Sequence, residues 1–202
     1  MQPFVFSLRH LAYQVALSVF FIGFELDLVG FCYLYWASYR VTLDGSPFMS
    51  GRYGLWEWCV TNVNKPRFED CRPTPDTGWL GGVRGLQCLA VVSYSVAAVS
   101  ILAQNWMFKP DSKFQRYRCF ELFALIGSAL VLGGFLLYLQ NIEREIATVV
   151  ANLNKMAIGE VQLVAVNYTD WCAVLYLAGT GVIMVATGVI SFFSDYSQTS
   201  VV

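Results

Sequence analysis

Four long apolar segments limit what this chain can fold into more than any other feature of its sequence. A helix needs about 20 predominantly apolar residues to cross the hydrocarbon core of a bilayer. Segments of that kind lie at residues 11–36, 83–106, 120–140 and 171–193. Only 13% of the residues are charged, which is about half the share in soluble domains. The sequence therefore predicts an all-α bundle of four membrane spans embedded in a lipid bilayer, and it excludes a disordered or water-soluble chain.

Charges in the predicted loops set the orientation of the spans. The loop between the second and third spans has a net charge of +3, and short basic loops stay on the cytoplasmic side. With four spans, both termini are then cytoplasmic, and residues 37–82 and 141–170 form the outer loops. The first segment could instead be a signal peptide, but no small-residue cleavage site follows it, so we treat residues 1–202 as one domain. The charges of the inner loop are Lys109, Lys113, Arg116 and Arg118 against Asp111.

The cysteines divide by their position relative to the spans. Cys59 and Cys71 alone lie in an outer loop, where the compartment is oxidising, so we expect one disulfide between them. A metal site is disfavoured because no histidine or further cysteine accompanies them. Cys119, at the cytoplasmic rim of the third span, is either a candidate for palmitoylation or a spare thiol. Three others lie within spans and are expected to behave as small apolar side chains: Cys32, Cys88 and Cys172.

The first outer loop has the pattern of a small antiparallel sheet. Residues 39–43 alternate polar and apolar side chains, and residues 54–60 form a second candidate strand. Turn-forming residues at 44–47 separate the two strands, and a second turn is expected at 64–66. Residues 161–166 form a further candidate strand. We therefore expect a folded outer module stapled by the Cys59–Cys71 disulfide.

A group of residues in and around this loop forms a pattern that resembles a known family. The pattern W…GLWxxC…C is made by Trp36, Gly54, Leu55, Trp56, Cys59 and Cys71. It is similar to the signature of the claudins and their relatives, which include the peripheral myelin and epithelial membrane proteins and the accessory gamma subunits of calcium channels and AMPA receptors. Arg84 matches the arginine that this family carries at the start of span two. The resemblance implies a left-handed four-helix transmembrane bundle with an extracellular sheet, to which residues 161–166 would add a strand.

The match to the family has departures. Leu175, Tyr176 and Leu177 resemble the family's Leu-Tyr-(Leu/Val)-Gly-Trp stretch, but Ala178 and Gly179 follow here in place of Gly-Trp. The interval between the two outer cysteines is slightly longer than in a typical claudin, and the second outer loop is extended. The resemblance therefore identifies the superfamily more closely than it identifies a barrier-forming claudin.

Two acids in the first span require an explanation. An acid at the centre of a membrane helix costs about 2.5–3.5 kcal/mol on insertion scales. Glu25 and Asp27 fall in the outer third of the span, and Arg84 lies at a similar depth in the second span. We therefore predict an ion pair or a hydrogen-bonded cluster between Arg84 and one of the two acids, which would tie the bundle to the sheet. The alternative is that the acids line a wet rim. A proton relay is disfavoured because little else in the spans is polar.

Two further patterns concern helix packing. The third span can continue outward as a helix, because one helical face beyond residue 140 is apolar at Ile142, Ile146, Val149, Val150 and Leu153. Small residues recur in the third and fourth spans and permit close contact between helices. They are Ala129, Gly133, Gly134, Gly179, Gly181 and Gly188.

No motif predicts catalysis. The single histidine, His10, has no partner nucleophile, and the sequence lacks the GxSxG, Walker and HExxH patterns. Thirteen basic residues against fourteen acidic give a net charge of −1, which provides no basic surface for nucleic acid. We therefore expect neither an enzyme nor a nucleic-acid-binding protein, and neither a metal nor another cofactor.

The end of the chain offers a partner site. Ser200, Val201 and Val202 form a C-terminal Ser-x-Val, which can add as a strand to a PDZ scaffold domain. Asn167 begins a glycosylation sequon, but it adjoins the fourth span and is expected to lie too close to the membrane for modification.

Three functions follow from the resemblance. The first is a claudin-like protein of plasma-membrane cell junctions, which associates with itself in one membrane and across two and so forms or regulates a paracellular barrier or channel. The second is an accessory subunit that binds a pore-forming channel or receptor subunit. The third is a membrane-organising tetraspan like the myelin proteins. No ion preference is predicted, because five basic and five acidic residues balance in the first outer loop.

Overall fold

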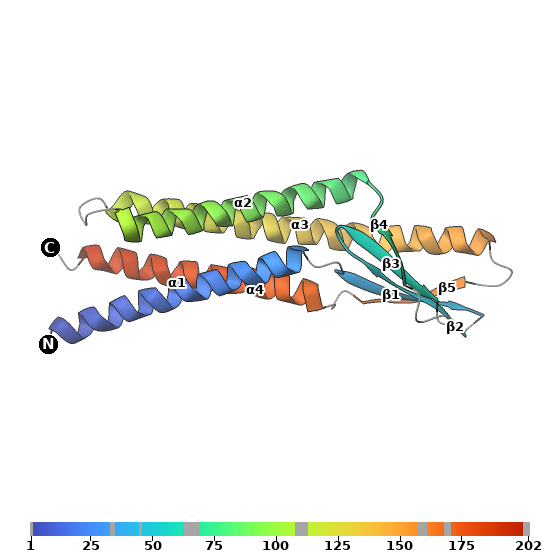
Figure 1. The fold of residues 1–202 in the computed structure, drawn as a ribbon, viewed down its shortest axis with the longest axis horizontal. Coiled ribbons are helices and arrows are strands. Elements are labelled where there is room, and N and C mark those ends of the chain that lie inside the picture. The colour runs from blue at the N-terminus through green and yellow to red at the C-terminus, as the bar shows by residue number, and fades with distance from the viewer. Residues whose placement is uncertain are drawn as a thin grey trace. The chain divides into compact units, whose positions relative to one another are not determined.

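The computed structural model describes nearly the whole chain and contains four helices and five strands (Figure 1). The described residues are 2–32, 35–44, 46–62, 69–107, 113–156, 161–167 and 171–199. In chain order the elements are α1 (Gln2–Cys32), β1 (Ala37–Leu43), β2 (Ser46–Tyr53), β3 (Glu57–Asn62), β4 (Glu69–Pro73), α2 (Gly78–Met107), α3 (Lys113–Met156), β5 (Val161–Asn167) and α4 (Trp171–Thr199).

Each of the four helices is long and apolar enough to cross a membrane, which confirms a long apolar helix at each of the four predicted positions. Their apolar stretches are Gln14–Cys32, Gly78–Ala103, Cys119–Asn152 and Ala173–Phe192. The first helix ends at Cys32, earlier than the predicted residue 36. By Trp36 the chain has already turned toward the sheet, because the backbone N–H of Trp36 donates to the Tyr53 carbonyl at 3.0 Å.

The chain forms two compact units, and the division falls within all four helices. Unit 1 contains residues 1–28, 86–132 and 176–202, and its described residues form helical segments. Unit 2 contains residues 29–85 and 133–175, which include all five strands and the second half of α3. Each unit is described below by its own contacts.

The sheet of unit 2 has the strand order β4-β3-β2-β1-β5, and every neighbouring pair is antiparallel. The predicted turn after residue 43 is confirmed: Leu43 pairs with Ser46, and Asp44 has a left-handed φ of 49°, which Asp tolerates in a tight hairpin. The strand β2 was not predicted, because Pro47 and Gly51 disguise its pattern. Residues 54–56, expected to open a strand, connect β2 to β3 instead.

One face of β1 and β2 is buried. Tyr39 pairs with Gly51 across the two strands, and Val41 pairs with Met49. All four are buried, and a Cβ added to Gly51 would overlap the Tyr39 ring. The glycine in β2 is therefore required by the aromatic ring that covers it, as happens where a tyrosine packs over a strand glycine.

The second half of α3 and strand β5 complete unit 2. The helix continues to Met156, as predicted, and Ile142, Ile146 and Val150 on its apolar face are buried. Strand β5 pairs with β1, so the predicted strand at 161–166 is confirmed as a member of the sheet. The side chains of Leu153 and of β5 lie outside the described residues.

Candidate functional site

The predicted disulfide is present and joins two neighbouring strands. Cys59 of β3 and Cys71 of β4 are bonded, and they stand directly opposite each other with their Cα atoms 4.1 Å apart. Cys59 is buried, and the Tyr35 hydroxyl lies 3.3 Å from its sulfur. On the same strand face, the guanidinium of Arg52 covers the Tyr35 ring. The disulfide therefore fixes β4, the edge strand of the sheet, to β3.

Trp36 lies at the centre of unit 2. Its side chain is fully buried, and its indole N–H donates to the Gly30 carbonyl at 3.0 Å. Its ring meets the Tyr138 ring edge to face at 5.3 Å, and the Tyr138 hydroxyl donates to the Tyr53 carbonyl at 3.0 Å. This one indole therefore connects the end of α1, the second half of α3 and the end of β2.

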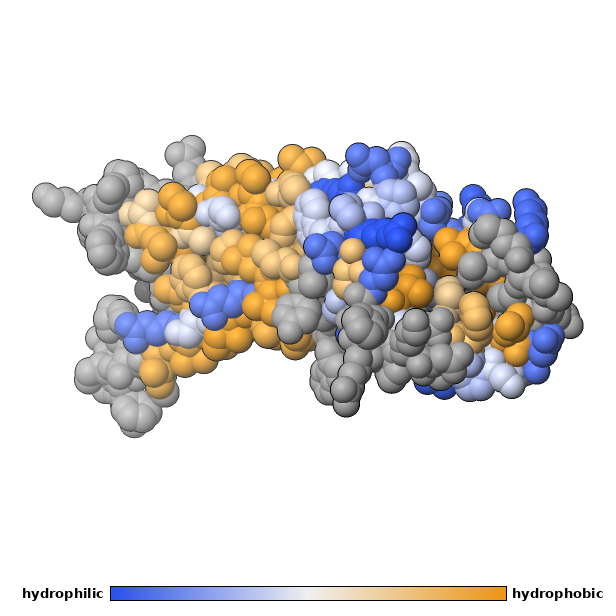
Figure 2. All heavy atoms as spheres, turned by 45° about the vertical axis from the view of Figure 1, so that its right-hand side comes forward, coloured by the Kyte–Doolittle hydropathy of each residue, from blue (hydrophilic) through white to orange (hydrophobic). Residues whose placement is uncertain are grey.

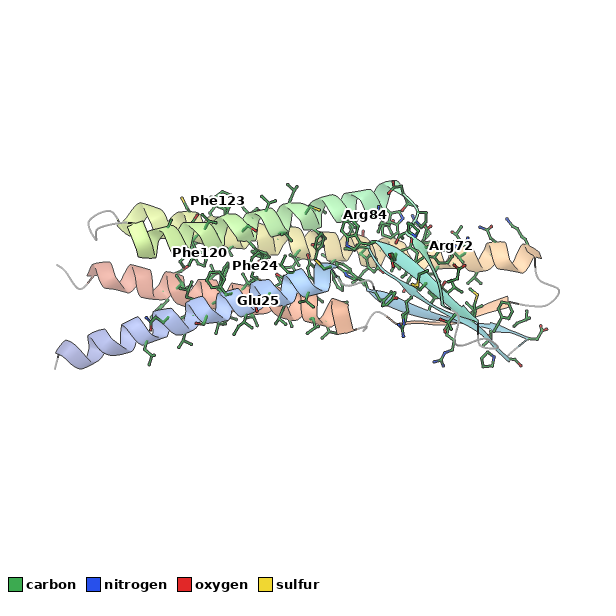
Figure 3. All side chains as sticks on the ribbon, in the orientation of Figure 1. Phe24, Glu25, Arg72, Arg84, Phe120 and Phe123 are labelled. Carbon is green, nitrogen blue, oxygen red and sulfur yellow. A yellow bond between two sulfur atoms is a disulfide. The ribbon has the colours of Figure 1, made fainter. Side chains whose placement is uncertain are left out.

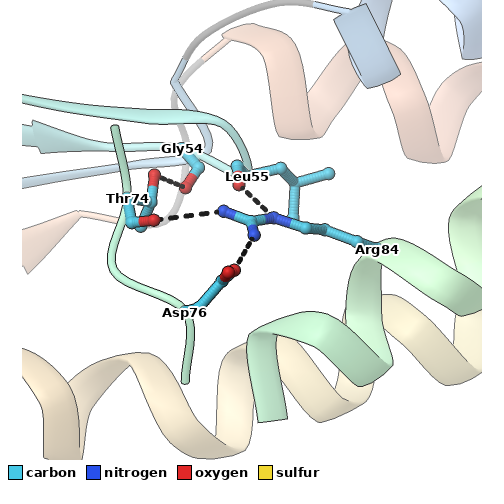
Figure 4. Close-up of polar contacts among 5 residues, drawn as sticks. All are labelled: Gly54, Leu55, Thr74, Asp76 and Arg84. Atoms are coloured by element: carbon cyan, nitrogen blue, oxygen red, sulfur yellow. Dashed lines mark hydrogen bonds and ion pairs between the residues drawn. The ribbon is translucent and has the colours of Figure 1, made fainter. Parts of the chain in front are cut away.

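Arg84 of α2 bonds to the loop before β3 and to the loop after β4 (Figure 4). Its Nε donates to the Leu55 carbonyl at 2.8 Å, and its Nη2 donates to the Thr74 carbonyl at 3.3 Å. Its Nη1 forms an ion pair with Asp76 at 2.6 Å. Thr74 is buried and closes the group with a hydroxyl bond to the Gly54 carbonyl at 3.3 Å. We call these five residues the Arg84 cluster.

Trp56 adjoins the Arg84 cluster. The Arg84 guanidinium lies 5.4 Å from its ring centroid, a distance at which a cation is attracted to an aromatic face. The indole N–H donates to the Phe31 carbonyl at 3.1 Å, and the two rings meet edge to face. Trp56 is still 36% exposed. The signature residues Trp36, Leu55, Trp56 and Arg84 therefore all hold the sheet to helix ends within unit 2.

Arg84 has partners other than the acids predicted for it. Its guanidinium bonds the Leu55 and Thr74 carbonyls and Asp76, all within unit 2. The physical reason is that two backbone carbonyls and a carboxylate close in sequence already satisfy all three sides of the guanidinium fork. The two acids of α1 therefore have separate explanations.

Asp27 belongs to a polar core within unit 1. It is 1% exposed, accepts a bond from the Thr180 hydroxyl at 3.1 Å, and interacts with the Tyr94 side chain. The Tyr94 hydroxyl lies 3.1 Å from that of Ser128. The Tyr176 hydroxyl donates to Gln87, whose amide donates to the Val131 carbonyl at 3.4 Å. The polar core consists of Asp27, Gln87, Tyr94, Ser128, Tyr176 and Thr180, and it draws on all four helices.

Part of this polar core was not predicted from the sequence. Gln87 and Ser128 were available as signals, because each is a polar residue within an apolar span, but nothing in the sequence places either one beside α4. Membrane helices use such residues to bond to one another, since no water is present to satisfy them.

Glu25 differs from Asp27 in its exposure and in its hydrogen bonding. It lies on α1 (Figure 3) and is exposed, and within the described residues its carboxylate has no hydrogen-bond or ion-pair partner. Residues two apart on a helix point in different directions, which is why one acid enters the polar core and the other does not.

Only one of the predicted small residues of α4 serves a close helix contact. A Cβ on Gly179 would lie 2.7 Å from the Gly23 carbonyl oxygen and 2.8 Å from the Asp27 carboxylate. At Gly181 and Gly188, and at Gly133 of α3, a Cβ would meet nothing within 4 Å. The close approach of α1 and α4 therefore depends on Gly23 and Gly179, and Gly23 was not predicted.

The remaining predicted sites are untested. Cys119 is exposed on α3, which leaves its palmitoylation a prediction. Ser200, Val201 and Val202 lie outside the described residues. In the described part of the chain, no group of three or more His, Cys, Asp or Glu residues could hold a metal ion.

Burial changes the ionisation of two sheet tyrosines. Burial raises the pKa of Tyr39 to about 12. Burial also raises the pKa of Tyr53, and the negative charge of Glu145 adds to the effect. The hydroxyls of both tyrosines are buried and have no hydrogen-bond partner among the described residues. Both are therefore neutral at physiological pH, and neither offers an acid or base for chemistry.

These features define a class: a multi-pass membrane protein with a disulfide-bonded antiparallel sheet. No family model matches the chain, and no curated protein matches it either. Any assignment within the class therefore depends on the residues described above.

Proposed function

We propose that the chain is a claudin-like membrane protein of cell–cell contacts, which forms or regulates a paracellular barrier or channel through its sheet. The observation that supports this proposal is the common role of the signature residues. In unit 2, the indoles of Trp36 and Trp56 donate to carbonyls at the end of α1, and Arg84 donates to the Leu55 carbonyl. Cys59 is bonded to Cys71. A sequence pattern that arose by chance would have no reason to form one connected structure.

In this proposal the sheet lies outside the cell and both termini lie in the cytoplasm. Copies of the sheet associate side by side in one membrane and head to head across two. The charged side chains that face solvent on the sheet, such as Arg40, Asp70 and Arg72, then meet the paracellular space. The C-terminal residues 200–202 bind a PDZ scaffold, which holds the protein at the junction.

Expression in cells that lack junctional strands tests this function. We expect wild-type protein to form strands at cell contacts in freeze-fracture images. The double variant Cys59→Ser/Cys71→Ser removes the bond that fixes β4 to β3. It is expected to reach the cell surface without forming junctional strands. Cys88→Ser, an exposed cysteine of α2, is the matched control and should form strands normally. Wild-type protein that is abundant at the surface but forms no strands would contradict the proposal.

A second candidate function is an accessory subunit of a channel or receptor. The exposed Glu25 favours it, because an acid within a membrane helix calls for a partner. Diffuse surface label, together with co-purification of a pore-forming subunit from the same cells, would support this function in place of the first.

A further inference from the structure

The exposed face of α1 has the spacing of a helix–helix seam. Leu11, Val15, Ser18, Ile22 and Glu25 are all exposed and follow one another at alternating intervals of four and three residues. This is the heptad spacing by which one helix packs along another. Val29 and Cys32 continue the same intervals. In Figure 2, a few hydrophilic side chains interrupt the hydrophobic surface of the helices.

Glu25 lies deep within this seam. It is eleven residues from Gln14 and seven from Cys32, the ends of the apolar stretch of α1. At about 1.5 Å per residue, it is roughly 16 Å from one end and 10 Å from the other. If this apolar stretch lies in the bilayer from end to end, a glutamate side chain is too short to reach water from that depth. The Ser18 hydroxyl donates to the Gln14 carbonyl within its own helix, so it does not require an outside partner, whereas the Glu25 carboxylate does.

Asp27 shows how this protein satisfies an acid internally. It is buried, and it takes the Thr180 hydroxyl and the Tyr94 side chain from other helices of unit 1. Glu25 points away from that core and has none of these contacts. An acid in the membrane almost always pairs with another group, and no described side chain provides one for Glu25, so we look for its partner in another molecule.

Charge decides what that molecule is. Among the unit 1 side chains that the structure describes, Glu25, Asp27 and Glu121 are acidic, and no lysine, arginine or histidine is present. A second copy of the seam itself would therefore bring another carboxylate, not a cation, opposite Glu25. A helix of a different protein with a basic residue at the matching depth provides the complementary charge.

We propose that the exposed α1 seam, Leu11, Val15, Ser18, Ile22 and Glu25, binds a transmembrane helix of another membrane protein through a lysine or arginine that pairs with Glu25. The apolar seam residues pack along the partner helix, and the ion pair fixes its position along the seam. This proposal does not depend on whether the sheet forms junctions.

A designed helix tests the proposal directly. The full chain is labelled and reconstituted in phosphatidylcholine vesicles with a labelled transmembrane peptide of about 20 leucine and alanine residues and one central lysine. A central lysine reaches the depth of Glu25 in either peptide orientation. The matched peptide has leucine in place of that lysine. Energy transfer between the two labels measures association as the peptide fraction rises.

We expect the lysine peptide to associate about tenfold more strongly than the leucine peptide with the wild-type chain. Glu25→Gln should reduce the association of the lysine peptide to the level of the leucine peptide. Glu121→Gln removes a carboxylate from α3 and should leave the difference unchanged. Thermal unfolding of each variant in the same lipid verifies that the bundle is folded, and Glu25→Gln should unfold no earlier than wild type.

Three results would overturn the proposal. The first is equal association of the two peptides with the folded wild-type chain, and the second is an undiminished preference for the lysine peptide in Glu25→Gln. The third is efficient disulfide cross-linking between two copies through Ile22→Cys in vesicles without peptide, which would assign the seam to a second copy of this chain.

Discussion

At the scale of single residues, two arginines show how position decides what a guanidinium contributes. Arg72 pairs with Asp70 at 2.8 Å, but both side chains are 66% exposed, and surface pairs of this kind contribute about 0–1 kcal/mol. Arg84 is 18% exposed and donates to two backbone carbonyls as well as to Asp76. Asp76 is far more exposed than Arg84, so Arg84 contributes mainly through its two backbone bonds.

Replacement of Arg84 by alanine is expected to destabilise unit 2 by about 2–4 kcal/mol, because the Leu55 and Thr74 carbonyls lose a charged donor. Asp76→Ala should cost less than about 1 kcal/mol, since the Asp76 side chain is 92% exposed. Arg72→Ala is the control and should be nearly neutral. Thermal unfolding in detergent measures all three. An Asp76→Ala loss as large as that of Arg84→Ala would show that the ion pair, not the carbonyl bonds, is the main contribution.

The buried tyrosine hydroxyl of β1 predicts a dependence of stability on pH. An unfolded tyrosine has a pKa of about 10, and burial raises the pKa of Tyr39 to about 12. Because the folded pKa is the higher, the contribution to stability is complete below pH 10 and is lost as the pH rises through 12. We therefore expect wild-type protein to lose stability over that interval, and Tyr39→Phe to lose less.

At neutral pH, Tyr39→Phe should be as stable as wild type or more stable, because the buried Tyr39 hydroxyl has no hydrogen-bond partner to lose. Unfolding curves at pH 7 and at pH 11 provide the comparison. A clear loss of stability at pH 7 would mean that the hydroxyl has a partner.

At the scale of elements, the contact between α1 and α4 depends on two glycines and one acid. Gly23 and Gly179 face each other so closely that a Cβ on either would lie within 3 Å of the other's carbonyl oxygen. The close approach also brings the Thr180 hydroxyl to Asp27. Small residues and interhelical hydrogen bonds are the usual means by which membrane helices associate, because lipid provides no hydrophobic driving force between them.

Gly179→Ala is expected to destabilise unit 1 by about 1–3 kcal/mol, because the added methyl group forces α1 and α4 apart. Gly181→Ala is the matched control two residues away in the same helix. A Cβ there meets nothing within 4 Å, so the change should be neutral or slightly stabilising. Thermal unfolding of both variants provides the comparison, and equal effects would mean that the two helices can separate at no cost.

The sheet shows which elements a sequence can predict. Strand β5 and the extended α3 were predicted because local periodicity and β-branched residues reveal them. The strand β2 was missed, because its glycine and proline are unfavourable in isolation. Gly51 is tolerated there only because Tyr39, on another strand, covers it. A compensation of that kind appears only after the strands pair.

At the scale of the whole molecule, four helices that are long and apolar enough to cross a membrane divide the chain into segments. The segment between α2 and α3 and the turn between β1 and β2 are separated by one of these helices, so they face opposite sides if all four helices cross. We propose that residues 109–119, whose net charge is +3, mark the cytoplasmic side, because basic segments next to spans stay in the cytoplasm.

A glycosylation sequon inserted in the β1–β2 turn, after Asp44, is expected to acquire a glycan, and the same sequon inserted after Pro110 is expected to remain unmodified. Asn167→Gln removes the natural sequon and provides the background for both. The measurement is the shift in gel mobility that an endoglycosidase reverses. Modification after Pro110 alone would reverse the proposed orientation of the termini.

The sequence by itself determined the number of spans, the disulfide, the continuation of α3 and the existence of β5. The spans, the helix and the strand depend on composition or periodicity within one segment, and the disulfide depends on two cysteines twelve residues apart in one predicted outer loop. Only the tertiary structure decided which groups bond to Arg84, which glycines permit the close helix contact and which acid enters the polar core. Asp27 and Thr180 are 153 residues apart in the chain. The partner of a buried polar group is set by helix rotation and packing, which no single segment encodes.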